Sequence, residues 1–329
     1  MASSMVLTIL PDVSAAPPVR RVGYLGPPGT FTEEALMSQA DLSSGELVSL
    51  ASVGDVLAAT ESGELDVGFV PIENAIEGTV TATLDALVFQ HRLLIQREVS
   101  IPIHMQLLGP AGLAVEDVRR VMAFPFAEAQ CRGFLASKLA SAEVVPAHSN
   151  AEAARRLAED RPEATAAIST ALAARLYGLE VLVAGVEDHP DNSTRFVAVA
   201  REGIPAPTGH DRTSIACFQK ADVPGSLQAI LGNFSARGIQ LSKLESRPTK
   251  KGLGDYCFII DLEGHVADEV VADCLRNLHA HLAELRFMGS YPAAGAHFEA
   301  GRRDVQEAWR SADEWVEALR AQVRDTPLT

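Results

Sequence analysis

The segment RVGYLGPPGTFTEEAL, residues 21–36, decides the fold of the first half of the chain. Its first five residues form a short apolar run typical of a buried strand, and a Gly/Pro loop follows directly. A helix is predicted to begin near Thr30, because Thr30 and Glu33 have the T-x-x-E spacing of a capping box. A strand that leads through a short loop into a helix is the building unit of α/β proteins. The loop lacks both the G-x-G-x-x-G spacing of a dinucleotide site and the lysine of a Walker loop.

The same alternation of apolar runs and helical patterns continues to about Arg201. It predicts an α/β region with largely parallel sheets. Further strands are expected at residues 66–72, 164–169 and 195–200. Helices are expected at residues 33–40, 52–62, 128–139 and 150–159.

The run REGIPAPTGHDR marks a boundary, because it is rich in Pro and Gly and has no period. Residues 202–212 are therefore interpreted as a linker. Residues 213–292 have the order strand, helix, strand, strand, helix, strand, which predicts a ferredoxin-like unit. Residues 301–324 carry apolar side chains at helical spacing, which predicts an amphipathic helix packed on another surface. Residues 1–20 are expected to be a loose leader, because no charge precedes their short apolar stretch.

Composition narrows the functional classes. The 329 residues are 47% hydrophobic, and 28 Lys and Arg stand against 43 Asp and Glu, a net charge of −15. Such acidity argues against a partner that is nucleic acid or an anionic membrane. The sequence contains no apolar run long enough to span a bilayer. Its four cysteines form no C-x-x-C pair, which favours reduced thiols in a cytoplasmic protein.

Two loops are candidates for binding an anion. One spans residues 26–30, and the other contains Glu73, Asn74 and Gly78. Both follow predicted buried strands and precede helices, whose first backbone N–H groups can bind anions. In a doubly wound sheet, both loops would lie at the ligand-binding edge. The alternative is structural, with residues 26–29 forming a tight turn and Asn74 bracing its own loop.

The segment DNSTRFVAVA supplies a third candidate, because Thr194 and Arg195 begin a predicted strand. Neighbouring side chains of a strand point to opposite faces, so both residues face one cleft only if the strand entry is irregular. Asn192 could share the side of Thr194. The alternative is a strand-forming Thr and a surface ion pair. No metal site is expected, because the His residues are isolated or, at His279 and His281, cannot share one helix face.

Four motifs occur in a specific order: GPPGTFTEEA (26–35), VPIENAIEGT (70–79), NSTRF (192–196) and, after a PG-L turn, ESRP (245–248). Together, over about residues 21–291, the sequence resembles prephenate dehydratase with a C-terminal ACT domain. The resemblance implies two α/β lobes around a cleft, like periplasmic binding proteins, within residues 21–201. It implies the conversion of prephenate to phenylpyruvate in L-phenylalanine biosynthesis. It also implies ACT domains that pair in a homodimer or homotetramer and bind L-phenylalanine as a feedback inhibitor.

The resemblance also implies roles for particular residues. Catalysis falls to Thr194, as donor to the leaving hydroxyl, and to Arg195, as partner of a substrate carboxylate. No cofactor is needed, because loss of carbon dioxide and hydroxide makes an aromatic ring. The residues implied in substrate contact are Thr30, Asn74, Ser149, Asn150 and Phe196. The residues implied in effector binding are Asp222, Pro224, Gly225, Ser226, Leu227, Glu245 and Ser246.

Three departures from the family pattern stand out. Ala75 replaces the usual Ser after Asn74, Ser226 replaces an Ala, and AFPFAEAQC (123–131) lacks the usual His–Pro–Gln. Three other functions stay open: an arogenate dehydratase, a non-catalytic amino-acid sensor, and an exported solute-binding protein. Ala75 mildly favours the sensor, and the intact Thr-Arg-Phe motif opposes it. The missing signal peptide opposes export.

Overall fold

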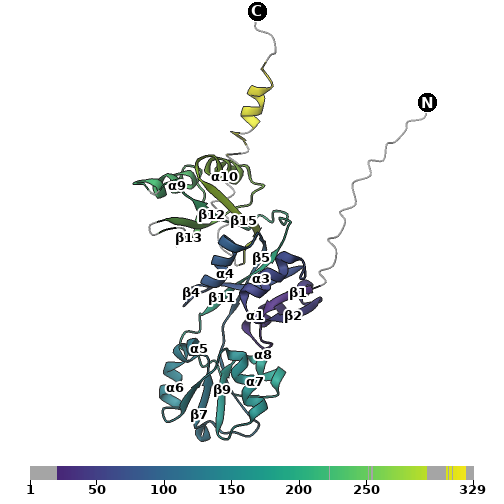
Figure 1. Cartoon of the computed structure of the whole chain (residues 1–329), viewed down its shortest axis with the longest axis vertical. Coiled ribbons are helices and arrows are strands. Elements are labelled where there is room, and N and C mark those ends of the chain that lie inside the picture. The colour runs from purple at the N-terminus through teal and green to yellow at the C-terminus, as the bar shows by residue number, and fades with distance from the viewer. Residues whose placement is uncertain are drawn as a thin grey trace, which may run out of the picture.

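The computed structural model describes residues 21–221, 223–250, 252, 255–294, 309, 311–312 and 314–323. Three bodies follow one another along the long axis of the molecule (Figure 1). We call them the first lobe, the second lobe and the C-terminal unit, each built on its own sheet. The expected leader, residues 1–20, lies outside the described residues.

The first lobe is a sheet of order β2-β1-β3-β11-β5, with the short strand β4 beside β3. Its strands are β1 (Arg21–Leu25), β2 (Glu46–Leu50), β3 (Val67–Asn74), β4 (Gly78–Thr79), β5 (Leu94–Pro102) and β11 (Ser193–Ala200). Its helices are α1 (Phe31–Met37), α2 (Ala40–Ser43), α3 (Val53–Ser62) and α4 (Thr81–Asp85), which a π-helical turn (Ala86–Gln90) extends. The predicted helix start near Thr30 is confirmed, because the Thr30 hydroxyl caps α1 by accepting from the Glu33 N–H.

The second lobe is a sheet of order β10-β6-β9-β7-β8. Its strands are β6 (Gln106–Gly109), β7 (Arg120–Ala123), β8 (Glu143–Pro146), β9 (Thr165–Ser169) and β10 (Glu180–Ala184). Its helices are α5 (Pro125–Gln130), α6 (Arg132–Lys138), α7 (Asn150–Asp160) and α8 (Ala171–Tyr177), with a 3₁₀ turn at Val115–Asp117. The single helix expected at 128–139 is wrong, since Cys131 leaves the helical conformation (φ −119°, ψ 18°) and separates α5 from α6.

The expectation of largely parallel sheets is wrong for both lobes, which are mixed. In the first lobe β1 runs parallel to β2 and β3, whereas β11 runs antiparallel to β3 and β5. In the second lobe β7 runs parallel to β8 and β9, whereas β6 runs antiparallel to β9 and β10. The reason is the path of the chain, which leaves the first lobe after β5, builds the second lobe and returns through β11. The returning strand enters between β3 and β5 in the opposite direction.

The C-terminal unit has the predicted element order. Its elements are β12 (Asp211–Phe218), α9 (Ser226–Ser235), β13 (Leu241–Pro248), β14 (Tyr256–Glu263), α10 (Glu269–His281) and β15 (Glu284–Pro292). The four strands form one antiparallel sheet of order β13-β14-β12-β15. Of the predicted amphipathic helix at 301–324, residues 314–320 are described and helical, and most of its first half lies outside the described residues. The Trp309 ring packs on the core of the unit, whereas Trp315 is exposed.

The C-terminal unit and the first lobe share one hydrophobic core. That core joins Val70 and Val197 of the first lobe to Ile259 and Tyr291 of the C-terminal unit, all nearly fully buried. The two backbones touch at Gly289, where an added Cβ would lie 2.5 Å from the carbonyl oxygen of Ile95. The predicted linker therefore divides the sequence into two regions, but these two regions share one core. Among the helices in the described ranges, none is long and apolar enough to cross a membrane.

Candidate active site

The strongest candidate for chemistry is the Thr194 hydroxyl, which lies at the start of β11 opposite the end of β3. Strand register pairs Thr194 with Asn74, and the Asn74 side-chain NH₂ donates to Thr194 Oγ1 over 2.8 Å. The Asn74 amide is fixed at its other end, because its Oδ1 accepts from the backbone N–H groups of Ile76 and Glu77 at 3.0 Å each. A hydroxyl oxygen that accepts a hydrogen bond keeps its own proton. The Thr194 hydroxyl thus retains a proton that it can donate to another group.

A chain of amide hydrogen bonds joins this pair to the second lobe. Asn74 also donates to Asn192 Oδ1 (3.0 Å), and Asn192 Nδ2 donates to Gln130 Oε1 (3.0 Å) at the end of α5. Gln130 Nε2 completes the chain by donating to Glu77 Oε1 (3.2 Å). Asn192 and Gln130 are buried, and paired buried amides fix geometry because breaking a pair leaves an unsatisfied polar group. The junction of the two lobes therefore holds the Thr194 hydroxyl in place.

The glycine loop before α1 meets the second lobe at the same junction. The Thr170 hydroxyl donates to the Gly29 carbonyl at 2.7 Å, and the Tyr177 hydroxyl donates to the Pro28 carbonyl at 2.8 Å. The Thr30 hydroxyl itself donates to the Leu25 carbonyl (3.2 Å) and accepts from the Glu33 N–H. The structure thus uses the Thr30 side chain for the cap, and a substrate contact by Thr30 stays a prediction.

Ser149 and Asn150 stand at the first turn of α7, in the second lobe. Ser149 caps the helix, since its Oγ accepts from the Glu152 N–H at 3.0 Å. Asn150 Oδ1 is buried and has no hydrogen-bond partner among the described residues. An unsatisfied buried oxygen costs on the order of 1–3 kcal/mol, so this amide is a good candidate to bind a ligand. A substrate contact by either residue stays a prediction.

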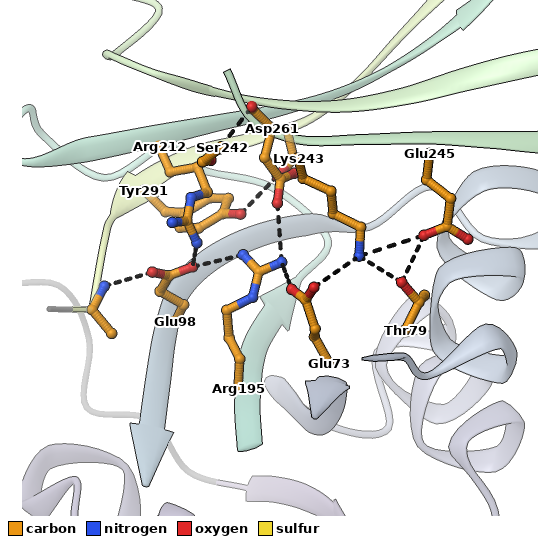
Figure 2. A network of polar contacts seen from close by, with 12 residues as sticks. Glu73, Thr79, Glu98, Arg195, Arg212, Ser242, Lys243, Glu245, Asp261 and Tyr291 are labelled. Atoms are coloured by element: carbon orange, nitrogen blue, oxygen red, sulfur yellow. Dashed lines mark hydrogen bonds and ion pairs between the residues drawn. The ribbon is translucent and has the colours of Figure 1, made fainter. Parts of the chain in front are cut away.

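Arg195 does not lie on the side of Thr194. Its guanidinium contacts three carboxylates, those of Glu73 (2.8 Å), Glu98 (3.0 Å) and Asp261 (3.0 Å), and Figure 2 shows it between the first lobe and the C-terminal unit. Burial would lower the pKa of Arg195, but these carboxylates outweigh it and hold the pKa well above its usual value. The predicted pairing of Arg195 with a substrate carboxylate is therefore wrong in this arrangement. Its charge is already balanced by protein groups on the opposite face of β11.

The predicted substrate contact by Phe196 is also wrong. Its side chain is 1% exposed and stacks on Phe69 inside the first lobe, with ring centroids 5.7 Å apart. The ring stabilises the core of the lobe and cannot reach a ligand from there.

Comparison with known proteins places the chain in a family. Residues 22–204 match the family model described as prephenate dehydratase. The chain belongs to the prephenate dehydratase family. The prephenate dehydratase of Mycolicibacterium vanbaalenii is 44% identical, covering 91% of this chain and 98% of the relative. The crystal structure of the Arthrobacter aurescens prephenate dehydratase in complex with L-Phe is 40% identical with a TM-score of 0.83, covering 92% of this chain and 99% of the other. A structure described as GqqA, a novel type of quorum quenching acylase, is 28% identical with a TM-score of 0.76, covering 84% of this chain and 98% of the other.

Against the usual family pattern, Ala75 lies in an exposed turn at the edge of the junction. Its backbone N–H donates to the Ser193 carbonyl at 2.8 Å, so the turn is tied to β11 without help from a side chain. The segment that lacks the family's His–Pro–Gln forms the start of α5, where Phe124 and Phe126 pack on each other with ring centroids 5.3 Å apart. Gln130, at the end of the same helix, is the residue that reaches Asn192.

The residues predicted for effector binding divide between two faces of the C-terminal unit. Four of them line an open pocket of about 890 Å³ beside α9: Gly225, Ser226, Leu227 and Ser246. Pro224 is exposed and is not among the lining residues, and Asp222 lies outside the described residues. Glu245 faces the first lobe, where its carboxylate accepts from the Thr79 hydroxyl at 2.6 Å and lies 3.6 Å from Lys243 Nζ. The predicted effector contact by Glu245 is wrong in this arrangement, because Glu245 and Ser246 are neighbours on β13 and point to opposite faces.

Proposed function

We propose that this chain is a prephenate dehydratase in which the Thr194 hydroxyl assists departure of the ring hydroxyl of prephenate. The observation that carries the proposal is the Asn74–Thr194 hydrogen bond, in a chain 44% identical to a curated prephenate dehydratase over nearly its full length. The hydroxide that leaves takes up a proton from solvent, so the products are phenylpyruvate, carbon dioxide and water, in the formation of L-phenylalanine.

The chemistry asks little of the protein beyond orientation and hydrogen bonding. The bond between the ring and its carboxylate breaks, and the electron pair enters the ring as the C–O bond to the hydroxyl breaks. The oxygen that leaves gains negative charge, and a donated hydrogen bond from Thr194 Oγ1 stabilises it most in the transition state. A threonine hydroxyl is too weak an acid to give up its proton beforehand, so this hydrogen bond strengthens as the C–O bond breaks.

The two substrate carboxylates need donors other than Arg195, whose guanidinium is engaged. The first turns of α1 and α7 carry N–H groups with no partner inside the helix, and such groups favour negative charge. Thr30, Ser149 and Asn150 stand at these turns. We assign them to substrate binding, together with Asn74, which orients Thr194.

The C-terminal unit is proposed to be an ACT regulatory domain that binds L-phenylalanine in the pocket beside α9. Its βαββαβ order supports this assignment, and so does the Arthrobacter aurescens enzyme, whose structure contains L-Phe. The pocket is open to solvent, which suits a site completed by a second copy of the unit in a homodimer or homotetramer. The domain division proposed with it keeps the predicted bounds of a catalytic region at 21–201, a linker at 202–212 and an ACT domain at 213–292, except that β12 begins at Asp211, within the predicted linker.

The proposal is tested by assaying the purified full chain with prephenate and with arogenate in parallel. Phenylpyruvate from prephenate is the expected product, and phenylalanine from arogenate would reassign the substrate. A third reaction with an N-acyl amide tests the activity named for the GqqA relative. Inactivity toward both prephenate and arogenate would overturn the proposal.

A further inference from the structure

A buried network of charges connects the strand that carries Thr194 to the C-terminal unit (Figure 2). Three cations and three carboxylates make up what we call the interface network: Arg195, Arg212, Lys243, Glu73, Glu98 and Asp261. Glu98 is central among the carboxylates, since it contacts both Arg195 (3.0 Å) and Arg212 (2.5 Å) and is 1% exposed. The Arg195, Glu98 and Asp261 side chains are largely buried, so their ion pairs are shielded from solvent and salt more than surface pairs are, whereas the Glu73 side chain is 37% exposed.

Asp261, on β14, is the carboxylate that the C-terminal unit supplies to Arg195. It is 4% exposed, accepts from the Ser214 hydroxyl at 2.6 Å, and lies 3.0 Å from the Arg195 guanidinium. Burial raises the pKa of Asp261, but Arg195, Ser214 and Arg212 together hold it below its usual value. Asp261 is therefore a charged group at neutral pH, held in one position by its neighbours.

The network lies one register step from the proposed catalytic pair. In the pairing of β3 with β11, Arg195 lies opposite Glu73 and Thr194 lies opposite Asn74. The Arg195–Glu73 ion pair (2.8 Å) therefore joins the same two strands as the Asn74–Thr194 hydrogen bond (2.8 Å), on the other face of the sheet. A bulge follows at once between Arg195 and Phe196 in the pairing with β3, whereas the pairing of β11 with β5 stays regular from Ser193 to Ala198.

We propose that Asp261 is a positioning residue for the reaction: through Arg195 and Glu73, the C-terminal unit sets the placement of Thr194 and Asn74. The inference rests on the proposed function, because its readout is turnover of prephenate. On this proposal the C-terminal unit contributes to catalysis itself. A shift of that unit would also change the position of the Thr194 hydroxyl directly.

The test is a double-mutant cycle in the full chain. Asp261→Asn removes the charge and keeps the shape, and we expect kcat to fall about tenfold with KM nearly unchanged. That loss is smaller than the ~10²–10³-fold expected for the direct donor, because the hydroxyl is displaced rather than removed. In a Thr194→Ala background, Asp261→Asn should cost nothing further, because no hydroxyl remains to be positioned.

Asp85→Asn is the matched control. Asp85 also forms a buried ion pair across the interface, with Arg247 at 2.7 Å, but has no contact with Arg195, Glu73 or Asp261 in the part of the chain described. It should lower the melting temperature without lowering kcat. Because Asp261→Asn can unfold the protein, Ser214→Ala serves as a milder variant, which removes one hydrogen bond from Asp261 and the contact between the Ser214 and Tyr291 hydroxyls.

Two results would overturn the inference. One is a wild-type kcat in both Asp261→Asn and Ser214→Ala. The other is the same fold loss in the Thr194→Ala background as in the parent, which shows a general effect on the fold. Failure of the proposed function is a different result, seen in the unmodified chain, which would then not turn over prephenate.

Discussion

Asn74 Nδ2 lies 2.8 Å from Thr194 Oγ1, although 120 positions separate the two residues in the chain. The contact exists because β11 returns from the second lobe and pairs beside β3, so that the end of one strand meets the start of the other. Everything that fixes this distance, including the turn at Ile76 and the amides of Asn192 and Gln130, also fixes the direction of the Thr194 hydroxyl.

Thr194→Ala should lower kcat ~10²–10³-fold and change KM much less, since the hydrogen bond to the leaving oxygen is made chiefly in the transition state. Steady-state kinetics with prephenate measures both constants. Thr194→Ser is the control, because it keeps the hydroxyl and should keep most of the activity. An unchanged kcat in Thr194→Ala would remove this residue from the chemistry.

Arg195→Ala should act first on stability. Removing the guanidinium leaves Glu73, Glu98 and Asp261 near one another without their shared cation, and breaking a buried ion pair in this way typically costs about 3–5 kcal/mol. Urea unfolding of the full chain measures the loss. A variant with wild-type stability and a raised KM for prephenate would return Arg195 to the substrate site.

Gly232→Leu should abolish binding of L-phenylalanine and leave basal turnover intact. Gly232 lines the pocket beside α9, and an added Cβ there meets no atom within 4 Å, so a larger side chain enters the pocket without strain. Gly225 is a poorer choice, because its φ of +87° favours glycine whatever the space. Gly232→Ala is the matched control and should still bind. Calorimetry and inhibition curves give the result, and undiminished binding to Gly232→Leu would move the effector elsewhere.

The stability that Asp261 contributes should disappear in acid. Its pKa is lower in the folded protein than the ~3.9 of an unfolded chain, so its contribution is complete above that value and is lost as the pH falls through the folded pKa. The gap in melting temperature between wild type and Asp261→Asn should therefore be widest near neutral pH and shrink below about pH 4. A gap that stays constant down to about pH 3.5 would show that the charge of Asp261 does not stabilise the fold.

Local patterns in the sequence predicted β1, β3, β9 and β11 and the starts of α1, α3 and α7, because these elements rest on local chemistry, but they missed the other seven strands of the two lobes. The apolar run at β1 and the hydroxyl that caps α1 at Thr30 are read within a few residues. The antiparallel direction of β11 was not predicted, because no residue near β11 indicates that the chain returns there from another lobe. The meeting of Gln130 with Asn192 was missed for the same reason, because 62 positions separate them.

Two of the errors at the sites, those at Arg195 and Glu245, have a common physical origin in the alternation of strand side chains. Thr194 and Arg195 are neighbours on β11 and face opposite sides, as the period of two requires. Ser246 and Glu245 divide in the same way on β13. Tertiary packing decides which face of a strand contacts the ligand and which contacts another part of the protein. The motif alone does not predict this.

The shared core of the first lobe and the C-terminal unit limits how regulation can work. The Gly289 backbone is in van der Waals contact with that of Ile95, so the C-terminal unit cannot move on its linker as an independent domain. A protease cut within residues 202–209 should leave two fragments that stay together and elute as one species. The effector proposed for the C-terminal unit would therefore have to act through small sliding movements between packed surfaces rather than through a hinge in the linker.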